Sequence, residues 1–472
     1  MAATVGVRSR SRRFGRGPAA PPTTPGRLRR VVVALVLCTA ALWGTLEAAL
    51  AGAHTTVSAA EAHADPALVD IAQLSYLLSD ADRVAAGSFA SGTVRLSGPG
   101  QRYQDDLKSA HQALARAAEH DATGPAGSGR LQAVEGLLVE YTSLIEQAHA
   151  TESQGALGAA YLSYASSLMH KPGDGVLAQV QQLRAAEQGE LSRQQQSGWL
   201  APVVLLGVLA PGVLALVLLV GAQRFLSRHF NRRLNPCLLT ASVLLLALAG
   251  WTVVATLHTD RAFGTATDEA LPRLTAAWQA RALAADAAGG DALAVVQTVP
   301  GQDLPDDFAT YIGPLADPPV TPGVVAAAAS RQPTFHGILA DLFDADLRPD
   351  SSPAKRDAAL HTLQDFQRFT AADAELRRQA ATRGPAAAPA ADPAVVATAV
   401  GPGAAQLGGA GAAFDADLAR LTELDRQWLA DAESAARSDL GLGGALPVLC
   451  AAIAALCLGG LWPRIDEYRA VR

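Results

Sequence analysis

Long apolar runs alternate with mixed apolar and polar stretches along this chain. Each run is close to the roughly 20 apolar residues that an α-helix needs to cross the hydrocarbon core of a bilayer. We expect one transmembrane helix in each of residues 31–53, 199–222, 237–257 and 444–462. The pattern leaves two long segments between these helices, residues 54–198 and 258–443.

The first apolar run has two interpretations. A basic start, an apolar stretch and then the small residues "AALAGA" resemble a secretory signal peptide with its cleavage site. Against cleavage, the run is long for the core of a signal peptide, and a helical pattern resumes soon after it. We therefore expect a retained anchor over residues 31–53, with cleavage as the alternative.

The first long segment shows clear helical periodicity. Its apolar positions recur at alternating spacings of three and four, as in a helix that packs within a bundle. One stripe is Leu131, Val134, Leu138, Tyr141, Ile145 and Ala148, and another is Leu74, Leu78, Ala81, Ala85 and Phe89. We expect a four-helix bundle over residues 54–198, whose first and last helices continue into the membrane.

The second long segment is less regular. Its stretch "RLTAAWQARALAADAAGGDAL" corresponds in position to "VDIAQLSYLLSDADRVAAGSF" in the first segment, which aligns Asp286 with Asp82. Residues 383–411 are rich in proline, alanine and glycine and suggest a mobile insert. We expect a duplicated unit and an all-α membrane protein, with four transmembrane helices carrying two extracytoplasmic helical-bundle domains in tandem.

Charge is distributed very unevenly along the chain. Residues 1–30, 223–236 and 463–472 together hold 15 arginines and 2 acidic residues. The two long segments hold 23 basic and 41 acidic residues. Because basic residues beside transmembrane helices stay in the cytoplasm, we expect both termini and the short loop inside and both long segments outside. The four cysteines lie in or beside the predicted helices, so no disulfide is expected in the outer segments.

The loop of residues 223–236 is strongly basic and contains no acidic residue. No DNA-binding fold accompanies it, which argues against a nucleic-acid partner. A signal for membrane orientation that also attracts anionic lipid explains the charge, and a docking site for a cytoplasmic partner is a further hypothesis. The candidate contacts are Arg224, Arg228, Arg232 and Arg233.

The most distinctive outer motif is "SDADR", residues 79–83. One interpretation is that Asp80, Asp82 and Arg83 contact a ligand or a partner protein, with Asp286 as their counterpart in the second segment. The alternative is a solvated helix edge beside the apolar position Ala81.

Motifs for catalysis and cofactor binding are not found in the sequence. It has no phosphate-binding loop with its lysine, no nucleophile elbow, no dinucleotide fingerprint and no pair of histidines at metal-binding spacing. The last three predicted spans contain no ionisable residue, which argues against a pump or transporter. We expect a protein without enzymatic activity, bound metal or cofactor.

The architecture resembles the GlnX-like four-span membrane proteins of actinobacteria. The resemblance lies in the arginine-rich start, "LSDADRVAAGSF", "RLTAAWQARALAADA" directly after the third span, and the order of the spans, and it covers most of the chain. The stretch "AADAAGGDAL" departs from it, since a more polar sequence is expected there. The family implies a relay in which an outer solute-binding lipoprotein senses amino acids such as glutamate or aspartate and a protein kinase G-type Ser/Thr kinase is affected inside.

The sequence thus predicts a transmembrane signal relay. Its expected partners are the lipid bilayer, an extracytoplasmic solute-binding lipoprotein or small ligand, and a cytoplasmic Ser/Thr kinase, with a second copy of the chain as a further candidate. Two other hypotheses remain open at this point: a structural or assembly protein of the cell envelope, and an accessory subunit of a transport complex.

Overall fold

The structure, a computed structural model, consists mainly of α-helices in the part of the chain that it describes. The described residues are 24–59, 65–92, 99–121, 124–196, 202–230, 236–264, 269–299, 302–330, 334–348, 353–382, 392–440 and 446–470. Within these ranges the β-structure is limited to one isolated antiparallel bridge between Asp317 and His336. The predicted all-α class is confirmed for this part of the chain.

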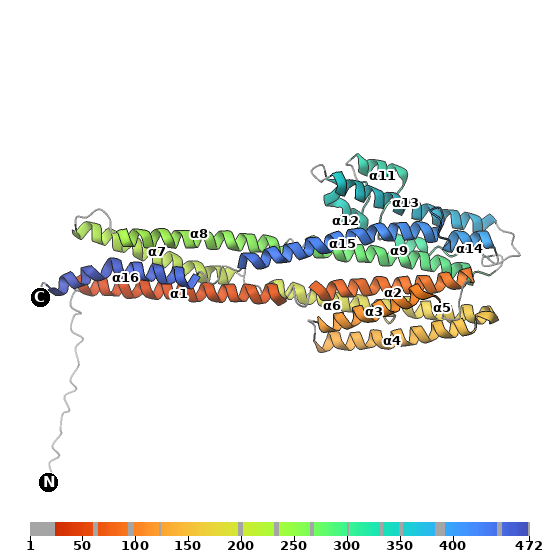
Figure 1. Cartoon of the computed structure of the whole chain (residues 1–472), viewed down its shortest axis with the longest axis horizontal. Helices are drawn as coiled ribbons and strands as arrows, with labels where there is room; N and C mark the ends of the chain where they lie inside the picture. Colours follow the sequence, from red (N-terminus) through yellow and green to blue (C-terminus); the bar gives the residue numbers. More distant parts are fainter. Residues whose placement is uncertain are drawn as a thin grey trace, which may run out of the picture. The chain divides into compact units, whose positions relative to one another are not determined.

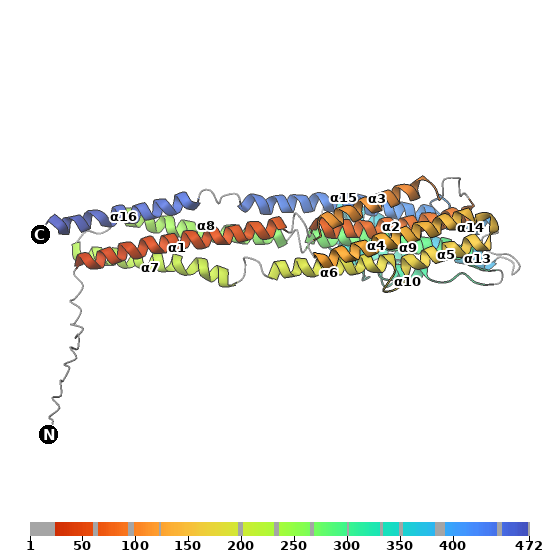
Figure 2. The ribbon, with the colours of Figure 1, turned by 90° about the horizontal axis from the view of Figure 1, so that it is seen from below.

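Contacts divide the chain into two compact units. The first unit comprises residues 1–51, 200–254 and 441–472. Its described helices are α1 (Thr24–Ala59), α7 (Pro202–Phe230), α8 (Pro236–Gly264) and α16 (Leu446–Ala470). These four helices run side by side (Figures 1 and 2) around a core that includes Leu35, Leu42, Leu219, Leu245 and Ile453.

The first unit is apolar outside as well as inside. Leu37, Val217, Val243 and Val448 are more than half exposed, although buried leucines lie on the opposite faces of the same helices. A helix that is hydrophobic all round belongs in a large core or in a membrane. Among the described residues, Arg29–Ala48 of α1 is long and apolar enough to span a bilayer, with 20 residues and a mean hydropathy of 2.0.

Three shorter apolar helical stretches coincide with the other predicted spans. They are Leu209–Phe225, Pro236–Thr252 and Leu446–Trp462. One clear candidate span is therefore found in the described part of the chain, and the remaining three spans stay a prediction. Helix α7 continues to Phe230, so the basic segment predicted as a loop begins inside a helix.

The second unit comprises residues 52–199 and 255–440, so it contains both long segments. The first segment forms α2 (Asp65–Ser91), α3 (Gln101–Glu119), α4 (Pro125–Ala150), α5 (Ala156–His170) and α6 (Val176–Gln196), with a 3₁₀ turn at Glu152–Gln154. The second segment forms α9 (Leu271–Gln297), α10 (Phe308–Ile312), α11 (Pro322–Ala329), α12 (Ile338–Leu347), α13 (Pro353–Thr382), α14 (Pro393–Val400) and α15 (Leu407–Leu440).

The two apolar stripes predicted in the first segment form its core. All six residues of the α4 stripe are buried, and Tyr141 and Val134 have no exposed surface. In α2 the first four residues of the stripe are buried and Phe89 is partly buried. The helical periodicity therefore predicted these buried faces correctly.

The two long segments pack together instead of forming two separate bundles. Helix α2 of the first segment lies along α9 of the second (Figure 1), and one core contains Leu74, Leu78, Leu274 and Trp278. The close approach explains the stretch "AADAAGGDAL", residues 284–293 in α9. A Cβ atom on Gly289 would lie 3.1 Å from the Cα atom of Arg83 in α2, so only glycine fits without displacing a helix.

The segment predicted as a mobile insert contains a packed helix. Residues 383–391 lie outside the described residues, but α14 follows directly. The Asp392 carboxylate accepts a hydrogen bond from the Ala394 amide, and Pro393 occupies the first helical position, which together start the helix. Val395 and Ala399 are buried, so the prediction of mobility is wrong for residues 393–400 because apolar burial fixes this helix.

Candidate functional site

The α2–α9 pair contains most of the buried charge in the second unit. Asp80 of α2 is 2% exposed and is held by two arginines. Arg83 donates from Nε at 2.8 Å, and Arg102 of α3 donates from Nη2 at 2.7 Å. Burial by itself would raise the pKa of Asp80, but the two guanidinium groups outweigh it and hold that pKa below its usual range.

A second ion pair joins α9 to α15. Arg281 of α9 donates from Nε to Asp415 of α15 at 2.7 Å, and the Tyr76 hydroxyl donates to the same carboxylate at 3.0 Å. The guanidinium carbon of Arg281 lies 3.9 Å from the ring centroid of Tyr76 and 4.5 Å from that of Trp278. Cation–π contacts therefore add to the ion pair, and three helices are joined through one arginine.

These two ion-pair groups line one cleft, named here the α15 cleft. It is formed by α2, α3, α9 and α15 and contains about 340 Å³ of empty space, part of which is open to solvent. Its charged and aromatic lining is Tyr76, Asp80, Arg83, Arg102, Arg281 and Asp415, and the rest is alanine and glycine. Each of these arginines is bonded to an aspartate, and the three guanidinium groups share the two carboxylates of Asp80 and Asp415.

Asp82, two residues further along α2, lies at the centre of a buried hydrogen-bond network. It is 4% exposed and accepts from the Tyr141 hydroxyl at 3.1 Å and the Ser166 hydroxyl at 2.9 Å, while His170 Nε2 lies at 3.2 Å. Burial would lower the pKa of His170, but the hydrogen bond to Asp82 and the charge of Asp286 raise it to about 9. His170 is therefore protonated at neutral pH.

Asp286 of α9 is also buried, but it has fewer hydrogen-bond partners than Asp82. It is 8% exposed, and its Oδ1 atom has no hydrogen-bond partner among the described residues. Burial raises its pKa to about 6, opposed by the charge of His170 and by the Ser79 hydroxyl and assisted by the charge of Asp82. Folding consequently disfavours the ionised form of Asp286 relative to the unfolded chain.

Arg184 of α6 is a cation that also has a buried polar atom without a described hydrogen-bond partner. Its Nη1 atom donates to the Gln279 side-chain oxygen at 3.1 Å, and its buried Nε atom has no partner in the described part of the chain. Burial lowers the pKa of Arg184, and no carboxylate there offsets that effect. The guanidinium is thus held by one neutral hydrogen bond alone.

Asp286 and Arg184 line a second cleft, named here the α6 cleft. It is formed by α2, α6 and α9 and contains about 460 Å³ of empty space, part of which is open to solvent. Its remaining lining combines apolar side chains with three polar ones: Ile71, Ala72, Leu177, Val180, Ala282 and Leu283 with Ser75, Gln181 and Gln279. Apolar walls with a few polar groups are typical of small-molecule sites.

The structure places the predicted outer contact residues in the interior. Asp80 and Arg83 line the α15 cleft, Asp286 lines the α6 cleft, and Asp82 lies in the network with Tyr141, Ser166 and His170. The alternative of a solvated helix edge is wrong for Asp80 and Asp82, because they are 2% and 4% exposed. Sequence analysis missed Arg102, Arg184 and Arg281, since their partners come from distant helices.

The predicted cytoplasmic contacts are described only in part. Arg224 is exposed near the end of α7, and Arg228 lies in the same helix. Arg232 and Arg233 lie outside the described residues. Docking of a cytoplasmic partner at these arginines therefore stays a prediction.

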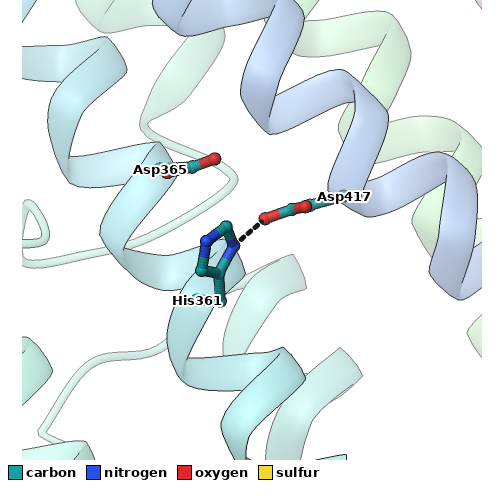
Figure 3. A group of neighbouring side chains, drawn as sticks. All are labelled: His361, Asp365 and Asp417. Carbon is teal, nitrogen blue, oxygen red and sulfur yellow. Dashed lines mark hydrogen bonds and ion pairs between the residues drawn. The ribbon is translucent and has the colours of Figure 1, made fainter. Parts of the chain in front are cut away.

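One group of side chains has donors suited to a divalent metal ion (Figure 3). His361 and Asp365 lie one turn apart on α13, Asp417 faces them from α15, and their ligand atoms lie within 4.8 Å of one another. His361 Nδ1 is 2.6 Å from Asp417 Oδ2. Arg368 pairs with Asp365 and Arg420 with Asp417, so a cation would have to displace two guanidinium groups. The group is satisfied as a set of ion pairs.

Residues 56–196 match the family model of an actinobacterial sensor domain. No curated protein and no solved structure matches the chain. The matched residues include α2 to α6 and therefore Asp80, Asp82, Arg102 and Arg184. The resemblance to GlnX-like proteins and their specific partners stays a prediction, whereas the sensor-type character is supported. The part of the chain that supplies one side of both clefts is similar to an actinobacterial sensor domain, which indicates a role in sensing or signalling.

Proposed function

We propose that this protein is a non-enzymatic transmembrane signal relay. In this proposal the second unit receives an extracytoplasmic solute-binding protein or a small ligand, and a separate cytoplasmic effector such as a Ser/Thr kinase reads the result. The observation that carries the proposal is the sensor-domain match over residues 56–196, which cover the helices α2 and α6 at the clefts.

The second segment completes the sensor in this proposal. Helix α9 packs along α2 and supplies Arg281 to the α15 cleft and Asp286 to the α6 cleft. A ligand or partner that changes the packing of α2 against α9 would thus act on both segments of the chain at once. Small shifts between packed helices are a common form of switching in signalling proteins.

The membrane part of the proposal is supported by the apolar helices and by charge. Residues 29–48 of α1 meet the length and composition of a span, and the three shorter apolar stretches coincide with predicted ones. The arginine-rich segments at both ends of the chain and at residues 223–236 favour a cytoplasmic location for all three. Helices α1 and α8 each contain residues of both units, which would join the sensor to the membrane helices by continuous backbone.

The proposal is tested by capture of the intact protein from its own membrane after cross-linking. Recovery of a solute-binding lipoprotein together with a soluble Ser/Thr kinase would support the relay. Recovery of cell-wall synthesis proteins alone would favour an envelope assembly role, and recovery of a transport complex would favour an accessory subunit. Either of these two results contradicts the relay.

A variant of the basic segment sharpens the test. Arg224, Arg228, Arg232 and Arg233 are replaced together by glutamine, and a reporter fused after Arg472 monitors the location of the C-terminus. If the topology is retained and the kinase is no longer captured, the effector docks at this segment. If topology and capture are both retained, the docking hypothesis is wrong.

A further inference from the structure

The α6 cleft contains one acid and one base that form no ion pair with a described residue. The Asp286 Oδ1 atom accepts no hydrogen bond, and the Arg184 guanidinium bonds only to the neutral side chain of Gln279, within the described residues. Buried charges are normally paired, because the loss of hydration is costly and must be offset. A cleft that retains two such groups gains from a ligand that supplies their partners.

The two groups do not satisfy each other. No ion pair joins Asp286 of α9 to Arg184 of α6, although both line the same cleft. A ligand with a single charge would compensate one of them and leave the other unsatisfied. A molecule that carries both an ammonium and a carboxylate group compensates both at once.

The surroundings of Asp286 also favour a cationic group there. Asp82 and Asp286 carry two negative charges when ionised, and His170 carries one positive charge. The group is therefore one negative charge in excess, and an ammonium group beside Asp286 restores neutrality. For Arg184, burial lowers the pKa and no described carboxylate raises it, so a carboxylate is the matching group on that side.

The remaining walls indicate an apolar body for the ligand. Ile71 of α2, Leu177 and Val180 of α6, and Leu283 of α9 line the cleft between its charged groups. An aliphatic side chain packed against them would be removed from water, which is favourable in proportion to its area. Ser75 and Gln279 provide further hydrogen-bonding groups for the charged end of the ligand.

We propose that the α6 cleft binds a small zwitterion, an amino acid with an aliphatic side chain, whose carboxylate pairs with Arg184 and whose ammonium group pairs with Asp286. This inference rests on the proposed sensory function, for which it supplies a directly bound ligand class. The α15 cleft is not suited to the same role, because its three arginines are already bonded to Asp80 and Asp415.

The binding test uses the full-length protein in lipid nanodiscs and isothermal titration calorimetry. The probes are L-leucine and L-valine, compared with 4-methylpentanoate, which lacks the ammonium group of leucine, and 3-methylbutylamine, which lacks its carboxylate. Saturable binding of leucine or valine, with each analogue at least tenfold weaker, is expected. Absence of binding by both amino acids, or equal binding of an analogue with one charge, would overturn the proposal.

Two variants assign the charges to their residues. Asp286→Asn and Arg184→Met should each weaken leucine binding by at least tenfold. The controls are Asp344→Asn, in an exposed pair with Arg348, and Arg193→Met, on the same helix as Arg184 but exposed and paired with Glu190. Binding that survives both cleft variants, or that is lost equally in the controls, contradicts the assignment.

A loss of leucine binding in these variants can be distinguished from misfolding. The binding site can also be tested separately from the proposed relay. Asp286→Asn removes a buried carboxylate that forms no ion pair, and Arg184→Met removes a partly buried guanidinium that forms none, so their melting temperatures without ligand should equal or exceed that of the native protein. If leucine binds but no cytoplasmic effector is captured, the relay is wrong and the site stands. If an effector is captured but no zwitterion binds, the relay stands and the site is wrong.

Discussion

The α15 cleft and the α6 cleft are both built on the α2–α9 pair, yet they use charge in opposite ways. In the α15 cleft Asp80 is bonded to Arg83 and Arg102, and Arg281 is bonded to Asp415 between two aromatic rings. In the α6 cleft Asp286 and Arg184 form no ion pair with a described residue. One cleft therefore holds helices together, and the other retains unsatisfied groups.

The charged side chains of the α15 cleft are therefore expected to stabilise the fold, and those of the α6 cleft to destabilise it. Removing one member of a buried pair leaves an uncompensated charge, whereas removing a buried charge that had no partner relieves a penalty. Sites that bind ligands commonly retain such a penalty because the same group is needed for function. Substitutions at the two clefts should consequently have opposite effects on stability.

The largest effect is expected at Arg281. Arg281→Ala removes the ion pair to Asp415 and both cation–π contacts. We expect the free energy of unfolding to fall by about 3 kcal/mol, at the lower end of the range for a broken buried pair, because Asp415 is 25% exposed and water can reach it. Thermal and denaturant unfolding in nanodiscs measure the change. Arg348→Ala, in an exposed pair with Asp344, should change stability by less than about 1 kcal/mol.

Asp80→Asn should also destabilise the protein, and its effect should depend on pH. The pKa of Asp80 is lowered below its unfolded value of 3.8. Ionised Asp80 therefore contributes to the free energy of unfolding above pH 3.8, and this contribution is lost as the pH falls through the pKa of the folded protein. We expect a loss of about 2 kcal/mol at pH 7, since Arg102 reaches solvent once released. The gap between native and variant protein should narrow on acidification, and a constant gap from pH 7 to pH 3 would contradict the ion-pair account.

Asp286→Asn should have the opposite sign. The pKa of Asp286 is raised from 3.8 to about 6. The contribution of its protonated carboxyl to the free energy of unfolding is therefore complete below pH 3.8 and is lost as the pH rises through 6. The groups that face it are Asp82 and Ser79 of α2, His170 of α5 and Tyr311 of α10. At pH 7 the variant should be more stable by about 1–3 kcal/mol, whereas at pH 4 the two proteins should be nearly equal. Unfolding curves at both pH values measure the difference.

The smallest effect concerns two glycines. A Cβ atom on Gly289 of α9 meets the Arg83 backbone at 3.1 Å, whereas nothing lies within 4 Å of a Cβ on Gly189 of α6. We expect Gly189→Ala to raise the free energy of unfolding by about 0.5–1 kcal/mol through helix propensity. Gly289→Ala should lower it by about 1 kcal/mol, because separation of the helices outweighs that gain. If both variants are equally stable, α2 and α9 are not packed this closely.

The local periodicity predicted the buried faces, and the long-range pairing was not predictable from it. Leu131 to Ala148 and Leu74 to Ala85 were assigned to helix cores because each stripe follows from spacing within one helix. The pairing of α2 with α9 depends on contacts between residues about 200 positions apart. The small residues of "AADAAGGDAL" are a local sign of this pairing, because they let two helices approach closely.

The buried charges could be anticipated only in part. Asp80 and Asp82 flank Ala81 within an apolar stripe, and a charged residue at such a position indicates burial with a partner. Their partners Arg102 and His170 follow from tertiary structure alone, because they come from two other helices. The same reason explains why the unsatisfied pair in the α6 cleft has no sequence motif.

The central claim is that Asp286 is retained for a ligand at a cost to stability, and one paired measurement tests it. Native protein and Asp286→Asn are compared in nanodiscs at pH 7 by thermal unfolding without ligand and by leucine calorimetry. The account predicts a higher melting temperature and at least tenfold weaker leucine binding for the variant. A lower melting temperature together with unchanged leucine affinity would show that Asp286 is a structural group, and would contradict the account.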